Sequence, residues 1–235
     1  MNGFDRSILV GLNHYARRVE WLDELAVLLN RSALFKGGVI MGMLWWQWFA
    51  TRAALRQVRS ILLTALAGGF LALMVGRALA LMLPFRIRPL HNPTLGFVIP
   101  YGSGPGEFQG WSSFPSDHAM MYFAIAVGLC FASRRAGAFA LAWTFLVICL
   151  PRIYAGQHHP TDILAGALVG TGIAILVQRG RIRDRLTAPL LEWSDRHPAA
   201  FYAALFLLTF MISTMFSDLR EVLRIGLYAV RGARG

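Results

Sequence analysis

The segment SILLTALAGGFLALMVGRALALML, residues 60–83, is an apolar run whose only charged side chain is Arg77. An α-helix needs about 20 mostly apolar residues to cross the hydrocarbon core of a bilayer. The run therefore predicts a transmembrane helix. Because a charge inside the bilayer is costly without a partner, we expect Arg77 to have a satisfied structural role.

The composition extends this prediction to the whole chain. Of its 235 residues, 56% are hydrophobic and 15% are charged, whereas soluble domains have about 25% charged residues. Five more apolar stretches reach or approach transmembrane length, at about 36–51, 117–133, 137–153, 160–178 and 199–216. The sequence thus predicts an all-α, polytopic membrane protein with a bundle of six transmembrane helices. One domain would cover residues 1–235, with its core motifs in 60–178.

Both ends of the chain have amphipathic patterns. Residues 8–29 place apolar side chains at helical spacing with charges between them, which is typical of a helix lying in the membrane interface. Residues 219–230 have the same character. The N-terminal region lacks the pattern of a cleaved signal peptide. Cys130 and Cys149 lie inside apolar stretches without disulfide or metal spacing, so both are interpreted as packing residues.

The formal net charge is +11, but the basic residues follow the pattern of a membrane protein. Arginines cluster in the short connections at 52–59, 134–135 and 179–185, where membrane orientation is their ordinary role, so nucleic-acid binding is not expected. Alternating helices would place these connections on the cytoplasmic side of the plasma (inner) membrane. The arginines within 220–234 run against this orientation, because they would follow the last helix to the outer side.

The richest polar cluster in the apolar part of the chain is Arg152 with the run from Gln157 to Asp162. His158 and Asp162 are four residues apart, so on a helix they would share one face. The carboxylate could then accept a hydrogen bond from one imidazole nitrogen and leave the other free as a base or nucleophile. Ionisable residues at such a position indicate a functional site.

Two further clusters, residues 84–89 and 114–118, fall at the same predicted membrane face, the extracytoplasmic one. Arginines suit phosphate oxygens, and a helix starting after Pro115 offers free N–H groups to an anion. The expected ligand is therefore a phosphate, attacked by His158, with the departing oxygen protonated by His118. No residue spacing is typical of a metal site, so arginines and helix amides would supply the positive charge, and no cofactor is predicted.

These motifs resemble those of the type-2 phosphatidic acid phosphatase superfamily of integral-membrane lipid phosphatases, which is related to vanadium haloperoxidases. The pattern of that family is Lys-x6-Arg-Pro, then Pro-Ser-Gly-His, then Ser-Arg-x5-His-x3-Asp. Here Arg88-Pro89 matches the end of the first motif, residues 115–118 match the second, and residues 152–162 match the third.

The resemblance implies a role for each matched residue. His158 would become a phosphohistidine, Asp162 would activate it, and His118 would be the acid. The substrate phosphate would be held by Arg88, Arg152 and Ser116. By its spacing, His159 is interpreted as a spacer or pocket wall, and His91 as a solvated loop residue.

The chain departs from the family pattern at three positions. Leu81 stands where the first motif has its lysine, and Arg86 is a better substitute than Arg77, which would lie about 16 Å deeper along an unbroken helix. In the phosphate-binding motif, Asp117 replaces glycine and adds a negative charge unless it turns away to cap the helix, the interpretation we favour. Pro151 replaces a serine, which removes one hydroxyl donor. The Pro-Ser-Asp-His form resembles bacterial undecaprenyl diphosphate phosphatases of the superfamily.

The long connection at residues 84–115 is rich in proline and glycine and cannot form a regular helix. A flexible lid or wall beside the site is its expected role.

The sequence thus predicts a metal-independent lipid phosphatase that hydrolyses a polyprenyl diphosphate to the monophosphate, a reaction of cell-wall biogenesis. Phosphatases for phosphatidic acid, phosphatidylglycerophosphate or lipid A are alternatives with the same catalysis. Because the motif lysine is missing, a lipid carrier or flippase with a vestigial phosphate site is the non-enzymatic alternative. The expected partners are the lipid phosphate and the bilayer, and no oligomeric state is predicted.

Overall fold

A computed structural model describes residues 1–50 and 55–232, with side chains up to residue 225. Within these ranges the regular structure is helical, without a β-strand. The side chains of Arg52, Arg231 and Arg234, which enter the orientation argument, lie outside the described part.

The helical elements are, in chain order, α1 (Gly3–Asn13), α2 (Glu20–Arg31), η1 (Leu34–Gly38), α3 (Val39–Ala50), α4 (Leu55–Met82), η2 (Pro89–His91), η3 (Pro93–Leu95), α5 (Asp117–Ala132), α6 (Arg134–Trp143), η4 (Thr144–Cys149), α7 (Leu150–Tyr154), α8 (Pro160–Val177), α9 (Gly180–Arg196), α10 (Pro198–Ser213) and α11 (Ser217–Gly232). Of these, η1 and η4 are π-helical, and η2 and η3 are short 3-10 helices.

Each of the apolar stretches found in the sequence is helical in the structure, which confirms the all-α fold. Among the described residues, three helices are long and apolar enough to cross a membrane: α4, the continuous helix Arg134–Tyr154, and α8. Two bent pairs raise the number to five if each is one span; they join α2 to η1 and α3 at 67°, and α10 to the start of α11 at 86°. The apolar helix α5 has only 16 residues. The helices indicate a multi-pass membrane protein, and the count of six spans stays a prediction.

The expected helix over residues 8–29 is interrupted by a turn between α1 and α2. Arg17 adopts a left-handed backbone conformation there, with φ of 59°. The buried carboxylate of Asp23 holds this turn, because it accepts the N–H of Arg17 at 2.9 Å and that of Tyr101 at 3.0 Å. It also accepts the hydroxyl of Tyr154. The N-terminal turn, the long loop and α7 are thus fixed to one carboxylate, and an interfacial position for α1 and α2 stays a prediction.

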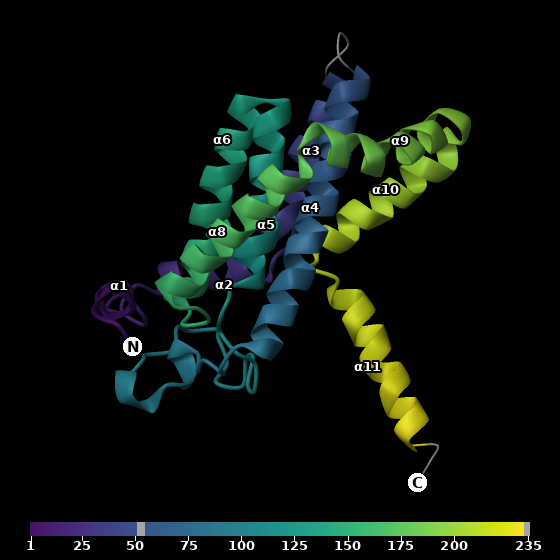
Figure 1. The fold of residues 1–235 in the computed structure, drawn as a ribbon. Coiled ribbons are helices and arrows are strands. Elements are labelled where there is room, and N and C mark those ends of the chain that lie inside the picture. The colour runs from purple at the N-terminus through teal and green to yellow at the C-terminus, as the bar shows by residue number, and fades with distance from the viewer. Residues whose placement is uncertain (51–54, 233–235) are drawn as a thin grey trace.

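The centre of the bundle is formed by α4, α5 and α8 (Figure 1). Glycines let α8 approach α5 closely: a Cβ on Gly166 would lie 2.7 Å from the carbonyl oxygen of Ser116, and one on Gly170 would overlap the carbonyl oxygen of Met120. Small residues at a spacing of four are typical of closely packed membrane helices. The N–H of Ser116 also donates to the carbonyl of Asp162 at 3.2 Å. This packing fixes the beginning of α5 against the beginning of α8.

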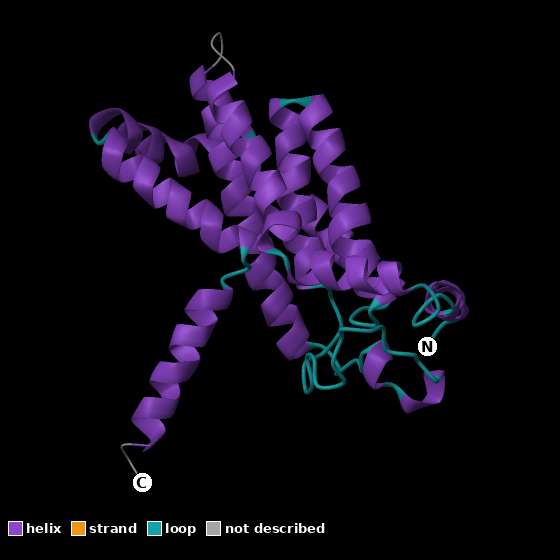
Figure 2. Ribbon diagram, turned by 180° about the vertical axis from the view of Figure 1, so that it is seen from behind, coloured by secondary structure: helices purple, strands orange, loops and turns teal. Residues whose placement is uncertain are grey.

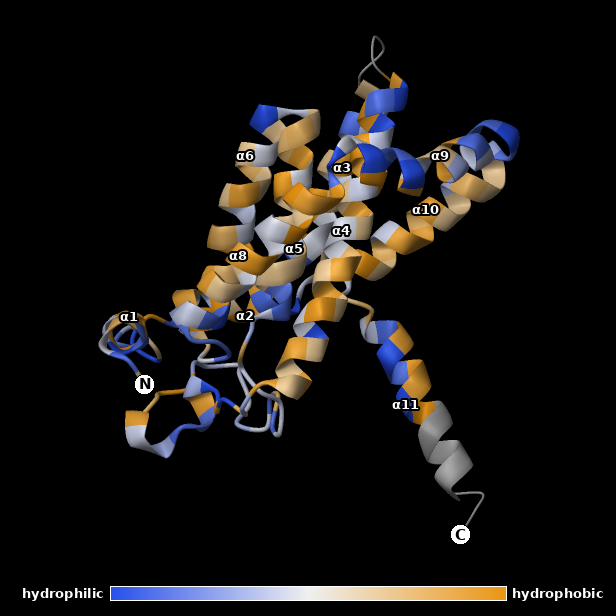
Figure 3. Cartoon of the chain, viewed as in Figure 1, coloured by the Kyte–Doolittle hydropathy of each residue, from blue (hydrophilic) through white to orange (hydrophobic). Residues whose placement is uncertain are grey.

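The two ends of the bundle differ in what they contain. The long loop after α4 gathers at one end, beside the end of α7 and the start of α8 (Figures 1 and 2). The start of α4, the turn from α5 to α6, and α9 lie at the opposite end, where hydrophilic residues are concentrated (Figure 3). After the bend, α11 extends away from the bundle on the loop side (Figure 2).

Candidate active site

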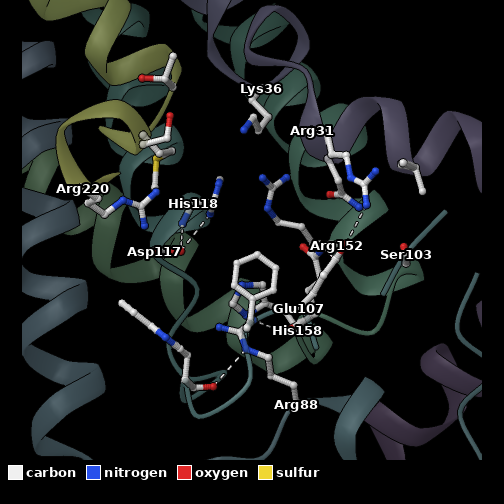
Figure 4. Close-up of a pocket in the computed structure, with 18 of the residues that line it drawn as sticks. Arg31, Lys36, Arg88, Ser103, Glu107, Asp117, His118, Arg152, His158 and Arg220 are labelled. Atoms are coloured by element: carbon white, nitrogen blue, oxygen red, sulfur yellow. Dashed lines mark hydrogen bonds and ion pairs between the residues drawn. The ribbon is translucent and has the colours of Figure 1, made fainter. Parts of the chain in front are cut away.

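The sequence motifs meet at the loop end of the bundle, where they surround a cavity of about 430 Å³. Its walls include six side chains from the motifs and from α4, most of them labelled in Figure 4: Arg77, Arg88, Asp117, His118, Arg152 and His158. The structure therefore brings both predicted catalytic histidines and two predicted phosphate ligands to one cavity. Three other predicted site residues do not line it, namely Arg86, Ser116 and Asp162.

His158 lies in the connection between α7 and α8 and is 4% exposed. Its Nδ1 is 2.8 Å from the carbonyl oxygen of Ser113 and 3.7 Å from Oδ2 of Asp162. With a proton on Nδ1 donated to the Ser113 carbonyl, Nε2 is left with a free lone pair, while Asp162 lies too far away for a direct hydrogen bond. Burial lowers the pKa of the imidazole below its ordinary value, and Asp162 acts in the opposite sense. The lowered pKa favours the neutral ring at pH 7, the form in which an imidazole can act as a nucleophile.

The Asp162 side chain also caps the start of α8. Its Oδ2 accepts the backbone N–H of His159 at 2.7 Å and lies 3.2 Å from Nδ1 of that ring. The His159 side chain in turn completes a reciprocal cap of the helix. His159 is 3% exposed and does not line the cavity, so it holds the helix start and not the phosphate.

Arg86 lies behind the cavity, where it joins two fully buried carboxylates. It donates to Asp5 at 2.7 Å and to Asp162, and also to the Thr161 hydroxyl at 2.9 Å. Asp5 additionally accepts the N–H of Thr161 at 2.9 Å. Two buried carboxylates without a cation would be strongly destabilising, which explains why Arg86 is drawn away from the phosphate position. The expectation that Arg86 replaces the missing motif lysine is not supported by this geometry.

Arg77 is the arginine of α4 that reaches the cavity. It forms an ion pair of 2.6 Å with Oδ2 of Asp117, whose Oδ1 is 3.0 Å from Nδ1 of His118. Arg77 reaches the site despite its position far from the end of α4, because α5 begins beside this part of α4. A Cβ on Gly76 would lie 3.7 Å from Cα of Asp117. Because Nδ1 of His118 contacts the Asp117 carboxylate, Nε2 of the same ring is directed away from that carboxylate.

The cap of α5 is Ser116 and not Asp117. The hydroxyl of Ser116 accepts the N–H of Ala119 at 3.4 Å, and the side chain is fully buried. Asp117 is the first residue of the helix and not its N-cap, although its carboxylate accepts the backbone N–H of His118 at 2.8 Å; the same carboxylate also pairs with Arg77 and with the His118 ring. A phosphate contact by Ser116 stays a prediction without support from its position.

Arg88 and Arg152 are buried cations at the cavity wall, 6% and 2% exposed. Arg88 donates to the backbone carbonyls of Trp111, Ser112 and Gln157, and burial lowers the pKa of its guanidinium to about 10. Arg152 donates to the carbonyl of Ile148 one turn earlier. Since a guanidinium has five N–H donors, both retain donors for phosphate oxygens.

The long loop forms one wall of the cavity, as the sequence predicts. Glu107 holds it in place, because it pairs with Arg31 of α2 at 3.1 Å and accepts the side-chain amide of Gln157 at 3.3 Å. Arg31 also donates to the carbonyl of Gly102 at 2.7 Å. His91 contacts the carbonyl of Pro105 within the loop and does not line the cavity.

A second cavity of about 550 Å³ adjoins the first, and five residues line both: Arg77, Arg88, Trp111, Asp117 and His158. Its other walls are mainly apolar and include Ala80, Leu83 and Phe85. Apolar surface therefore begins next to His158. Within the described ranges no group of three or more His, Cys, Asp or Glu is placed to hold a metal ion.

Sequence reasoning missed several residues around the site: Asp5, Lys36, Glu107 and Arg220. Asp5, Glu107 and Arg220 belong to no motif, and their roles depend on partners distant in sequence. Lys36 did have a signal, because it is the single lysine of the chain and precedes two glycines.

Comparison with known proteins agrees with these motifs. Residues 55–185 match the PAP2 superfamily. Undecaprenyl-diphosphatase BcrC of Bacillus subtilis strain 168 is 27% identical over 173 residues, covering 72% of this chain and 78% of the relative. Putative undecaprenyl-diphosphatase YbjG of Escherichia coli K12 is 29% identical over 151 residues, covering 64% and 69%. Lipid A 4'-phosphatase of Bacteroides thetaiotaomicron is 35% identical over 89 residues, covering 36% and 38%.

No solved structure matches the chain. The superfamily match nevertheless spans more than half of the sequence and contains every motif residue that lines the cavity. The chain therefore belongs to the PAP2 superfamily and, with its phosphatase relatives, is a hydrolase of the phosphatase class.

Proposed function

We propose that this protein hydrolyses a polyprenyl diphosphate to the monophosphate and inorganic phosphate, without a metal, at the extracytoplasmic surface of the plasma membrane. The observation that carries the proposal is the placement of His158 and His118. They come from different elements, yet they line one cavity together with the buried Arg88 and Arg152. Two histidines and two arginines around one space suit phosphoryl transfer.

The reaction would have two steps. Nε2 of His158 forms a bond to the terminal phosphorus while the bridging oxygen leaves with the bond electrons and takes a proton from His118. Water then attacks the phosphohistidine and gives a proton to His118; the bond from phosphorus to Nε2 breaks, inorganic phosphate leaves, and both histidines are restored. Arg88 and Arg152 would stabilise the charge on the oxygens around phosphorus in both transition states.

The preference for a polyprenyl diphosphate rests on two observations. Two relatives are named as undecaprenyl-diphosphatases. The apolar walls of the adjoining cavity also favour a lipid over a soluble phosphate ester, because they offer an apolar chain contact next to the site.

The test uses purified protein in detergent and measures phosphate release from a polyprenyl diphosphate. His158→Ala is expected to reduce turnover by at least about 1,000-fold, because removing the nucleophile leaves only binding and charge stabilisation. Quenching of the wild type in alkaline SDS during turnover with substrate labelled in its terminal phosphate should trap a base-stable, acid-labile phosphoprotein that H158A lacks. Near-wild-type phosphate release by H158A would refute the proposed role.

Independence of a metal has its own test. Turnover after treatment with a strong chelator should equal turnover before it, because the buried arginines supply the positive charge. A strict requirement for an added divalent ion would contradict the proposed chemistry.

A lipid A phosphatase activity is the second candidate, since a lipid A 4'-phosphatase is 35% identical over 36% of this chain. It would use the same histidines on a different lipid. Parallel assays with polyprenyl diphosphate, lipid A, phosphatidic acid and phosphatidylglycerophosphate rank the substrates by kcat/KM. A higher kcat/KM for lipid A would replace the polyprenyl assignment and leave the catalytic assignment intact.

A further inference from the structure

The cavity contains more positive charge than a single phosphate requires. Besides the arginines of the motifs, Lys36 and Arg220 line it. Neither side chain has a hydrogen-bond or ion-pair partner within the described residues, although most other cations at this end of the bundle do. Two unneutralised cations in a shared cavity repel each other and are costly unless an anion joins them.

Lys36 is held in this position by close packing. It lies in the π-helical turn η1, which packs against the end of α10. A Cβ on the next residue, Gly37, would overlap the hydroxyl of Tyr122 and lie 2.5 Å from Cα of Ser213. The Tyr122 hydroxyl in turn donates to the carbonyl of Ile212 at 3.0 Å. The lysine is therefore presented by a rigid contact and not by a mobile loop, and π-helical turns of this kind are frequent at functional sites.

Arg220 enters the cavity from the other side of the same contact. The bend of 86° after α10 turns the chain so that Thr214 and Ser217 line the cavity together with the first turn of α11. Two residues at this bend, Met215 and Phe216, have positive φ values of 55° and 56°. Such conformations are unfavourable for large side chains, and they persist where the surrounding structure requires them.

Lys36 and Arg220 interact electrostatically with His118, the proposed general acid, or with its partners. The charges that act most strongly on Lys36 are those of Arg152 and Arg220. Lys36 also acts on His118, and Arg220 interacts with Arg77 and Asp117, the partners of that histidine. In Figure 4, Lys36 and Arg220 lie on the His118 side of the cavity, with Arg88 at the opposite end. Arg88, by contrast, acts on the nucleophile His158.

We propose that Lys36 and Arg220 form a second anion subsite that binds the leaving phosphate of a diphosphate substrate. The inference rests on the proposed function and specifies its substrate as a diphosphate in place of a monophosphate. The terminal phosphorus bonds to Nε2 of His158, and its bond to the bridging oxygen breaks. That oxygen takes the proton of His118 and stays on the second phosphate, which departs with the lipid as a monophosphate. Lys36 and Arg220 neutralise the charge that this phosphate gains.

The experiment compares two substrates that differ only in the second phosphate, farnesyl diphosphate and farnesyl monophosphate. In the double variant Lys36→Gln/Arg220→Gln, kcat/KM for the diphosphate is expected to fall about 100-fold or more, as two charge-assisted contacts are lost. For the monophosphate the fall should be less than about 3-fold, because that substrate has no group in the subsite. The single variant Lys36→Arg keeps the positive charge and should retain most of the diphosphate activity that the single variant Lys36→Gln loses.

Two controls make the comparison strict. Arg224→Gln removes a cation one turn further along α11 that pairs with Glu221 and does not line the cavity, so both activities should remain at the wild-type level. Retained monophosphate activity in the double variant shows that it is folded. An equal loss on both substrates, or no loss on the diphosphate, overturns the proposal.

A binding measurement separates failure of the subsite from failure of the proposed function. Methylenediphosphonate, which cannot be cleaved, should bind the wild type at least about 10-fold more tightly than inorganic phosphate, as measured by the ligand-dependent shift of thermal unfolding. The double variant should lose this preference. If the wild type hydrolyses other lipids but no polyprenyl diphosphate, the proposed function fails while this preference still supports the subsite. A wild type that binds both anions equally overturns the subsite.

Discussion

At the residue scale, the proposed mechanism makes the reaction depend on the protonation of His158. In that mechanism the neutral imidazole attacks phosphorus, and burial lowers the pKa of this ring below the ordinary value for histidine. The protonated, inactive form therefore accumulates only on the acid side of pH about 6.5. The acid limb of the kcat/KM profile should therefore have its midpoint below pH about 6.5, and the need for a proton on His118 should add a decline on the alkaline side.

This profile is measured with farnesyl diphosphate, after the titration of the substrate phosphates has been determined separately by phosphorus NMR. An acid midpoint above the ordinary histidine value would show that Asp162 outweighs burial at this ring.

The aspartate that replaces the family glycine should act through the acid. Asp117→Asn keeps the shape of the side chain but removes the charge that lies between Arg77 and His118. We expect kcat to decrease by about 10-fold to 100-fold with KM changed by less than about 3-fold, because His118 acts in the transition state. Steady-state kinetics provide the measurement. Arg77→Lys retains the cation and should lose less activity, and a wild-type kcat in D117N would rule out a positioning role.

The two arginines of the first motif region show how far residue patterns reach. The motif spacing identified His118, His158, Arg88 and Arg152, and the structure brings these four to one cavity. Sequence reasoning favoured Arg86 over Arg77 as the substitute for the motif lysine, whereas the structure places Arg77 at the cavity and Arg86 behind it. The distance along α4 does not reveal that α5 begins beside Arg77, where Asp117 pairs with it. Nor does it reveal that Asp5 forms an ion pair with Arg86 behind the cavity. Such choices depend on buried partners from distant parts of the chain, which no local pattern contains.

At the element scale, the contact of α5 with α8 sets the distance between the two histidines. Gly170→Ala would place a methyl group against the carbonyl oxygen of Met120, a rigid backbone atom. Overpacking of this kind costs about 1–3 kcal/mol, and separation of the helices should also reduce turnover. Thermal unfolding and phosphate release are the measurements. Gly172→Ala, on the same helix with no atom within 4 Å of the added group, is the matched control and should behave as the wild type.

The first helix should stabilise the site from behind. Asp5→Asn leaves Arg86 with one carboxylate fewer and removes an acceptor from the start of α8. Breaking a buried ion pair costs about 3–5 kcal/mol, so the variant should unfold at a lower temperature and lose activity as Asp162 is displaced. Arg6→Gln changes the adjacent exposed residue and should have neither effect. Unchanged unfolding in D5N would show that α1 contributes little.

The elements themselves were predictable to different degrees. Long apolar runs located α4 and α8 within a few residues, since length and hydropathy alone determine such helices. The break between α1 and α2 was not predicted, because the amphipathic spacing continues across it. Its cause is the carboxylate of Asp23, which binds the loop and the turn together, a tertiary effect.

At the scale of the whole molecule, the two ends of the bundle should face different compartments. We expect the loop end to face outward, because the arginines within 134–135 and 179–185 gather at the opposite end. In a protein whose Cys130 and Cys149 are replaced by serine, Gly106→Cys should react with a membrane-impermeant thiol reagent on intact cells. Asp184→Cys should react only after permeabilisation. The reverse pattern would place the active site on the cytoplasmic side.

The junction of Asp5 with Arg86 and Thr161 also has a consequence for biogenesis. α1 is synthesised before its partners: its buried carboxylate lacks Arg86 until α4 and the start of the loop after it have been made, and lacks Thr161 until the chain has been synthesised as far as α8. Burying the Asp5 carboxylate without a partner is costly, so α1 should stay in contact with water or headgroups while the later helices are inserted. We therefore expect the first helix to dock last, which makes completion of the active site the final step of assembly.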